Sequence, residues 1–108
     1  MSVTTNQTMN LTRNWLAQAH GELVFSRRVQ VLSRALADLM PHDARVLDVG
    51  CGDGSIAALI QQHRPDLTIT GIDVLVRPHT RIPVTAFDGT TIPFSDDQFD
   101  AVMFVDVL

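Results

Sequence analysis

The fold of this chain is decided by one stretch, Val46-Leu47-Asp48-Val49-Gly50-Cys51-Gly52-Asp53-Gly54. Its first half is short and aliphatic, which is typical of a strand buried in a parallel sheet. Its second half repeats glycine at every other position, which predicts a tight turn because glycine tolerates a positive φ. Apolar residues at helical spacing follow, so we expect a helix over Ser55–Arg64. The stretch therefore predicts a strand, a glycine turn and a helix in succession.

Upstream of this stretch, residues from Leu23 to Met40 carry an apolar stripe at helical spacing. The stripe consists of Phe25, Val29, Leu32, Leu36 and Leu39. Spacings of three and four residues place these side chains on one face of a helix. Residues 1–20 are mostly polar. They are predicted to form a flexible lead to a domain that covers residues 21–108.

Three more strands are expected downstream, over Leu67–Ile72, Val84–Phe87 and Phe99–Val107. The first two run directly into acidic residues, Asp73 and Asp88. Only ten residues, Val74–Pro83, connect Asp73 to the next strand, and they include two prolines. Because a parallel crossover usually needs a dozen or more residues, we expect an irregular connection there. The order of elements predicts an α/β fold with a mainly parallel sheet.

Composition narrows the class of protein. The 108 residues are enough for one domain, and 45% of them are hydrophobic, which is typical of a globular core. A net charge of −4 argues against a nucleic-acid partner. A membrane span would need an apolar run of about 20 residues, and none occurs. A single cysteine rules out an internal disulfide, and the four scattered histidines suggest no metal site. We expect a cytoplasmic protein.

Acidic residues and glycines gather at the carboxyl ends of the expected strands. The glycine turn opens a helix, whose N-terminus suits a carboxylate or a phosphate. Asp73 ends the second strand, where an acid can accept hydrogen bonds from ribose hydroxyls. Asp88 ends the third strand. Ligands of open α/β sheets bind outside the carboxyl ends of the strands, so we expect the ligand at this edge.

Four segments in this order resemble the successive motifs of class I S-adenosylmethionine-dependent methyltransferases: Val46–Gly54, Gly71–Val74, Asp88–Gly89 and Phe99–Val102. The resemblance covers about residues 23–108 and is greatest to the methyltransferase-11-like group of small-molecule enzymes. It implies a Rossmann-like methyltransferase fold, with three layers and strand order 3-2-1-4. It also implies an enzyme that transfers a methyl group from S-adenosyl-L-methionine to a small-molecule acceptor.

The resemblance also implies which residues contact the cofactor. They are Asp48, Gly50, Cys51, Gly52, Asp73, Val74, Asp88 and Gly89. The first four would hold the methionine end, and the next two would meet the ribose and the adenine ring. The last two would bind the adenine amino group. The resemblance assigns no catalytic residue.

Other interpretations of the same residues stay open. A dinucleotide fingerprint would need glycine or alanine at Ser55, so that ligand is disfavoured. The glycine turn could also bind no ligand. Asp48 could only pin the turn, and Asp88 could only form an Asx turn before Gly89. Cys51 lies beside a helix N-terminus, which lowers a thiol pKa. No base is paired with it in sequence, so we expect a backbone contact rather than nucleophilic catalysis.

The last eight residues are apolar apart from one aspartate, whereas the sheet of the family has seven strands. We therefore expect the N-terminal, cofactor-binding half of a methyltransferase domain, truncated after the fourth strand and inactive alone. The free edge of that strand predicts a homodimer, because unpaired backbone groups are a template for another strand. The alternative function is a non-catalytic truncated fragment that self-associates.

Overall fold

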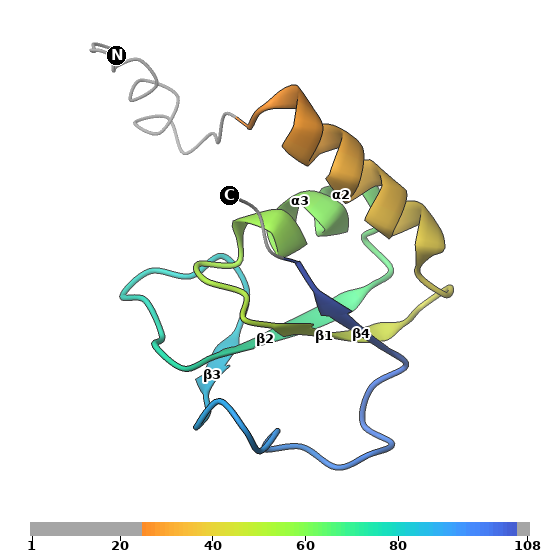
Figure 1. Cartoon of the computed structure of the whole chain (residues 1–108). Helices are drawn as coiled ribbons and strands as arrows, with labels where there is room; N and C mark the ends of the chain where they lie inside the picture. Colours follow the sequence, from red (N-terminus) through yellow and green to blue (C-terminus); the bar gives the residue numbers. More distant parts are fainter. Residues whose placement is uncertain (1–24, 106–108) are drawn as a thin grey trace, which may run out of the picture.

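A computed structural model describes residues 25–105 of the chain. The helices are α2 (Arg27–Leu39) and α3 (Ser55–His63), and the strands are β1 (Arg45–Val49), β2 (Thr68–Asp73), β3 (Val84–Ala86) and β4 (Ala101–Phe104). All four strands are parallel and lie in the order β3-β2-β1-β4 (Figure 1). This confirms the predicted α/β fold and strand order. The predicted lead over residues 1–20 lies outside the described residues.

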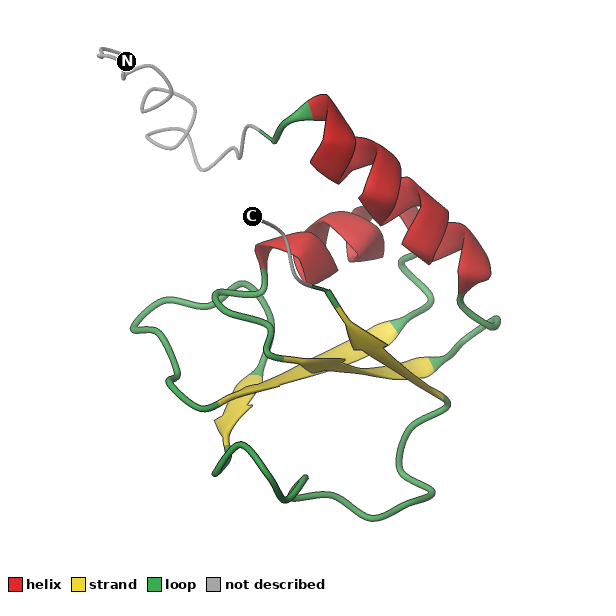
Figure 2. Ribbon diagram, viewed as in Figure 1, coloured by secondary structure: helices red, strands yellow, loops and turns green. Residues whose placement is uncertain are grey.

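Both helices cover one face of the sheet, and the loop over residues 87–100 runs across the other (Figure 2). Side chains alternate between these faces, since successive residues of a strand point in opposite directions. On the face toward the helices, Val46, Ile69 and Met103 are at most 5% exposed and pack with Ala57 and Ile60 of α3. This packing is the hydrophobic core. No helix within residues 25–105 has the length and apolar character that crossing a membrane requires.

Helix α2 begins later than its apolar stripe suggested. Ser26 is its N-cap, and the Ser26 hydroxyl accepts a hydrogen bond from the Val29 N–H at 3.2 Å. The buried side chains of α2 are Val29, Ser33 and Ala37, whereas Leu39 is 77% exposed. Leu39 therefore lies on the predicted apolar stripe but faces solvent. Small side chains at the contact with α3 allow the two helices to approach closely, and this contact sets the buried face.

Arg64 joins the end of α3 to the end of α2. It is the C-cap of α3 rather than its last helical residue, so the predicted end differs by one position. The Arg64 Nη1 donates to the carbonyl oxygens of Ala37 at 2.7 Å and Met40 at 3.0 Å. These carbonyls lie where a helix runs out of internal partners. Arg64 also pairs with Asp66, at 2.8 Å between Nη2 and Oδ2.

The connection over residues 74–83 contains no helix, as predicted. It returns to the sheet through a hydrogen bond from the Gly71 N–H to the Pro83 carbonyl at 2.8 Å. Ile82 is 5% exposed and belongs to the core. The connection therefore replaces a crossover helix by inserting one aliphatic side chain beside α3.

Strand β4 is shorter than the predicted Phe99–Val107. Phe99 precedes the strand and packs edge-on against Phe94, at 5.2 Å between ring centroids. Asp100 joins the start of β4 to β1 through Arg45. Its Oδ2 accepts from the Arg45 N–H at 2.8 Å, and its Oδ1 accepts from Arg45 Nη2 at 3.0 Å. The predicted end of the strand lies outside the described residues.

Candidate cofactor site

The glycine turn between β1 and α3 has the backbone that its sequence predicts. Gly50, Gly52 and Gly54 have φ values of 71°, 60° and 81°. Other residue types rarely adopt this left-handed region. The Gly50 N–H donates to the Ile72 carbonyl at 2.8 Å, which ties the start of the turn to β2. The three glycines are therefore required by the backbone conformation of the turn.

The two ends of the turn differ in how closely they are packed. A Cβ at Gly54 would lie 2.6 Å from Cγ1 of Ile82, whereas a Cβ at Gly50 would meet no atom within 4 Å. Gly71 on β2 is also crowded, because a Cβ there would overlap Cys51 Sγ. Gly50 thus leaves open space at the carboxyl end of β1. A ligand can approach the backbone there, and this is the fit that a bound cofactor requires.

Asp73 is joined directly to the glycine turn. Its Oδ2 accepts a hydrogen bond from the Gly52 N–H at 2.7 Å, and its Oδ1 accepts from the Val74 N–H at 2.7 Å. Each carboxylate oxygen has two lone pairs, so both keep one for a further donor. Asp73 is half-buried, with side-chain atoms open to solvent. It can bind a hydroxyl group of a ligand while it holds the turn.

Asp48 is a buried acid beneath this edge of the sheet. It is 3% exposed, and its carboxylate accepts no hydrogen bond from the described residues. Burial, followed by the nearby charge of Asp73, raises the pKa of Asp48 to about 6. The interpretation that Asp48 only pins the turn finds no such bond within residues 25–105. A cationic group close by would relieve the cost of its buried charge.

Cys51 differs from its expected chemistry. Burial, followed by the charges of Asp48 and Asp73, raises the pKa of its thiol to about 11. The expectation of a lowered pKa was wrong, because two carboxylates and partial burial outweigh the helix N-terminus. The thiol contacts Gly71 closely. Cys51 is therefore a packing residue under the turn.

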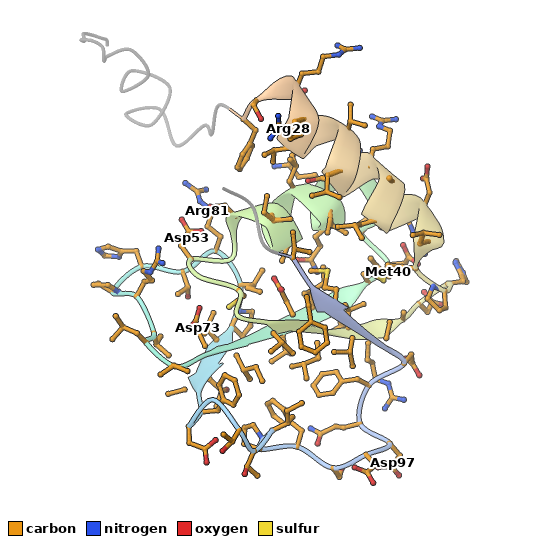
Figure 3. The ribbon with its side chains drawn as sticks, viewed as in Figure 1. Arg28, Met40, Asp53, Asp73, Arg81 and Asp97 are labelled. Atoms are coloured by element: carbon orange, nitrogen blue, oxygen red, sulfur yellow. The ribbon has the colours of Figure 1, made fainter. Side chains whose placement is uncertain are left out.

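Arginines from the irregular connection reach the turn, and the sequence analysis did not single them out. The Arg81 N–H donates to the Asp53 carbonyl at 2.8 Å. Figure 3 shows Arg81 and Asp53 near each other at the turn. Partial burial acts to raise the pKa of Asp53. The hydrogen bonds from Ser55 and the charges of Arg77 and Arg81 outweigh it and hold that pKa below its usual value. A connection too short for a helix, directly after Asp73, is the signal that could have pointed to these residues.

Asp88 and Gly89 lie at the end of β3 and are exposed. The Asp88 Oδ1 accepts from the N–H groups of Thr90 at 2.8 Å and Thr91 at 2.7 Å, which is an Asx turn. These hydrogen bonds hold the pKa of Asp88 below its usual value. A Cβ at Gly89 would lie 3.3 Å from Cγ2 of Val74, so the structure brings these two positions together. Binding of adenine by this group stays a prediction.

A separate cavity lies on the face of the sheet away from the helices. It has a volume of about 490 Å³ and lies between the loop and the sheet, with Leu47, Phe94, Phe99 and Val102 in its lining. None of the eight predicted cofactor residues lines it. The candidate site is therefore the carboxyl edge of the sheet.

His42, Asp43 and Asp66 bring potential metal ligands within 4.8 Å of one another, at the opposite end of β1. His42 approaches Asp66 through Nδ1 at 3.5 Å and Asp43 through Nε2 at 3.4 Å. Both oxygens of Asp66 already accept from the Arg64 guanidinium, at 2.9 and 2.8 Å. A guanidinium cation disfavours a metal cation at the same carboxylate. This group is best explained as an ion-pair cluster that joins the loop between α2 and β1 to the loop between α3 and β2.

Comparison with known families identifies the family of the chain. A family model described as a methyltransferase domain matches residues 17–108. The chain belongs to this methyltransferase-domain family, and the match confirms the resemblance that the four sequence motifs indicated. The search of curated proteins gave no match to the chain.

Proposed function

We propose that this chain binds S-adenosyl-L-methionine and takes part in methyl transfer to a small-molecule acceptor. The observation that carries the proposal is the hydrogen bond from the Gly52 N–H to Asp73 Oδ2 at 2.7 Å. It joins the left-handed glycine turn to an acid at the end of the adjacent strand. In open α/β sheets, an acid about 20 residues beyond a glycine turn binds the hydroxyl groups of a ribose.

Different residues of the site would contact different parts of the cofactor. Asp73 would accept hydrogen bonds from the ribose through its remaining lone pairs. Val74 and Gly89 would flank the adenine ring, and Asp88 would face its amino group. Asp48 and the turn would hold the methionine end. When bound, the cofactor supplies a methyl group on a sulfonium ion, which an acceptor atom attacks in line as the carbon–sulfur bond breaks.

These residues would contribute to catalysis through position. A sulfonium ion already activates its methyl group, so fixing the cofactor at the strand ends supplies proximity and orientation. The buried carboxylate of Asp48 adds negative charge near the methionine end, where the cofactor is cationic. The single cysteine is consistent with the proposed cytoplasmic location, where thiols stay reduced.

The test is calorimetric titration of the chain with S-adenosylhomocysteine. Asp73→Ala should weaken binding by about 1.5–3 kcal/mol, as expected for lost charge-assisted hydrogen bonds. Asp73→Asn keeps an oxygen that can accept from the Gly52 N–H but removes the negative charge. It therefore distinguishes the effect of the charge from the effect of the hydrogen bond that holds the turn. Asp88→Asn is the matched variant on the neighbouring strand. The side-chain oxygen of Asn can accept the same backbone hydrogen bonds as Asp88 and so preserves the Asx turn. Unchanged affinity in Asp73→Ala would remove Asp73 from the site.

We also propose that the outer edge of β4 pairs with the same edge of a second copy. Among the described residues, β4 is hydrogen-bonded to β1 alone, and Val102 and Phe104 on it are 50% and 73% exposed. An isologous contact between two such edges closes as a dimer. Light scattering should show a dimer that Phe104→Lys dissociates without loss of helical circular dichroism. A monodisperse monomer of 11.9 kDa would contradict this proposal.

A further inference from the structure

The cavity on the face of the sheet away from the helices lies under the loop over residues 87–100 (Figure 2). Its volume of about 490 Å³ is within the range of sites that hold small molecules. Leu47 and Val102 form its floor, because they are neighbours in register on β1 and β4. Val46 and Met103, the adjacent residues, face the helices, so these two side chains face the loop. The cavity therefore has a floor in the sheet and a wall in the loop.

Hydrogen bonds hold the loop at both ends of this cavity. At one end, Asp88 Oδ1 accepts from the N–H groups of Thr90 at 2.8 Å and Thr91 at 2.7 Å, and both threonines line the cavity. At the other end, the Asp100 N–H donates to the Arg45 carbonyl at 2.8 Å. Because these bonds fix the loop without a ligand, binding there costs less conformational entropy.

The lining of the cavity is largely apolar and open to solvent. Its apolar residues are Leu47, Ile92, Phe94, Phe99 and Val102. The two phenylalanine rings pack edge to face, with their centroids 5.2 Å apart. Ile92 and Val102 are 42% and 50% exposed. An apolar group placed here would remove this surface from water, and that removal favours binding.

The charge around the cavity has one sign. Asp96 is the charged residue of the lining, and it forms no ion pair within 4 Å among residues 25–105. From Ile82 to Leu108 the sequence contains aspartates but no lysine, arginine or histidine. Arg45, at the edge of this region, is already paired with Asp100 at 3.0 Å. A surface of one sign concentrates ligands of the opposite charge, and the faces of aromatic rings also attract cations. The cavity therefore favours a positively charged ligand.

We propose that this cavity binds an organic cation, in which a compact apolar or aromatic group carries an ammonium charge. The apolar group would lie over Leu47 and Val102, and the ammonium group would lie near the carboxylate of Asp96. No residue assigned to the cofactor lines the cavity. This inference therefore does not depend on the proposed function, and either one can fail without the other.

The experiment uses three probes of similar size and different charge. They are 2-phenylethylamine, which is a cation at pH 7, 2-phenylethanol, which is neutral, and phenylacetate, which is an anion. Titration of the chain, followed by nitrogen–proton correlation spectra, should show a Kd of about 1 mM for the amine, with shifts at the amides of Phe99 and Val102. The alcohol should bind about fourfold more weakly, and the anion should not saturate.

Two variants separate the charge of Asp96 from the charge of the region. Asp96→Asn should weaken the amine about fourfold, to the affinity of the alcohol, and change the alcohol less than twofold. Asp97→Asn removes the same charge from the next residue, which does not line the cavity. It is the matched control and should change each probe less than twofold. Unchanged affinity for the amine in Asp96→Asn would overturn the proposal.

A third variant tests whether the probes occupy the cavity. Val102→Phe adds a ring to the floor at a half-exposed position, so it should abolish binding of all three probes. Circular dichroism checks that the variant folds. Retained binding in folded Val102→Phe, equal affinity for the three probes, or no saturable binding of the amine to the unsubstituted chain would each overturn the proposal.

Discussion

The two faces of the sheet are covered in different ways, and they differ in how well they exclude water. On the face covered by α2 and α3, Val46, Ile69 and Met103 are at most 5% exposed. On the face covered by a loop, Leu47 is 1% exposed but its neighbour in register, Val102, is 50% exposed. Helices with small contact residues cover a sheet continuously, whereas the loop covers only its centre. The helical face thus supplies the rigid frame on which the glycine turn is built.

The largest effect should come from truncating a side chain on the helical face. Ile60 is fully buried between α3 and the sheet, so Ile60→Ala should lower the free energy of unfolding by about 4 kcal/mol. Val102→Ala on the loop-covered face should lower it by only about 0.5 kcal/mol. Urea denaturation followed by circular dichroism measures both. Similar losses would mean that the loop seals its face as well as the helices do.

The glycine turn should show the same contrast between a closely packed position, Gly54, and an open position, Gly50. Gly54→Ala combines a left-handed backbone with overlap against Ile82 on the helical face. It should lower the free energy of unfolding by about 3 kcal/mol. Gly50→Ala has the backbone strain but open space, and should lower it by about 1 kcal/mol. The same denaturation experiment compares the two variants, and equal losses would rule out crowding by Ile82.

Asp48 is the ionisable group that the helical face buries, and its pKa of about 6 makes stability depend on pH. Between about pH 4 and 6 the folded state binds more protons than the unfolded state. The free energy of unfolding should therefore fall as the pH rises through this window, by about 2–3 kcal/mol. The Asp48→Asn variant keeps every other titrating group of the unsubstituted protein, and it should remove this decrease in the free energy of unfolding. A parallel pH dependence in both proteins, measured at pH 4.5 and 7.5, would contradict the assignment.

One substitution on the helical face should instead increase stability. Ser33 is fully buried on α2, and its hydroxyl has no hydrogen-bond partner within the described residues. Ser33→Ala removes this cost and favours the helix, so the free energy of unfolding should rise by about 1 kcal/mol. Ser26→Ala, which removes the N-cap of the same helix, should lower it by a similar amount. Thermal unfolding of the two variants measures these changes in stability, which have opposite signs.

The sequence was sufficient for the parts of the molecule that local chemistry dictates. The aliphatic run before Gly50, the alternating glycines and the acid at Asp73 each have a local physical reason, and the structure places them as predicted. The irregular connection followed in the same way from its length and its prolines. These features depend on neighbours in the chain, which a sequence displays directly.

Features that depend on tertiary contact could not be predicted in this way. Leu39 fits the helical period, but the approach of α2 to α3 through Ser33 and Ala37 turns it to solvent. The pKa of Cys51 rises because tertiary packing partly buries the thiol, and because the charges of Asp48 and of Asp73, on the next strand, lie nearby. Arg77 reaches Gly52 only through the path of an irregular loop. In each case the deciding neighbour is distant in sequence or has no periodic pattern.

The hydrogen bond from Gly52 to Asp73 makes one backbone amide a spectroscopic reporter of the site. A short bond to a carboxylate moves an amide proton resonance to low field, and the resonance responds when the carboxylate gains another donor. The amides of Thr90 and Thr91 bond to Asp88 in a comparable way, one strand further along the edge. A single nitrogen–proton correlation spectrum would thus follow the proposed ribose and adenine ends of the site separately, in solution and without a label on the ligand.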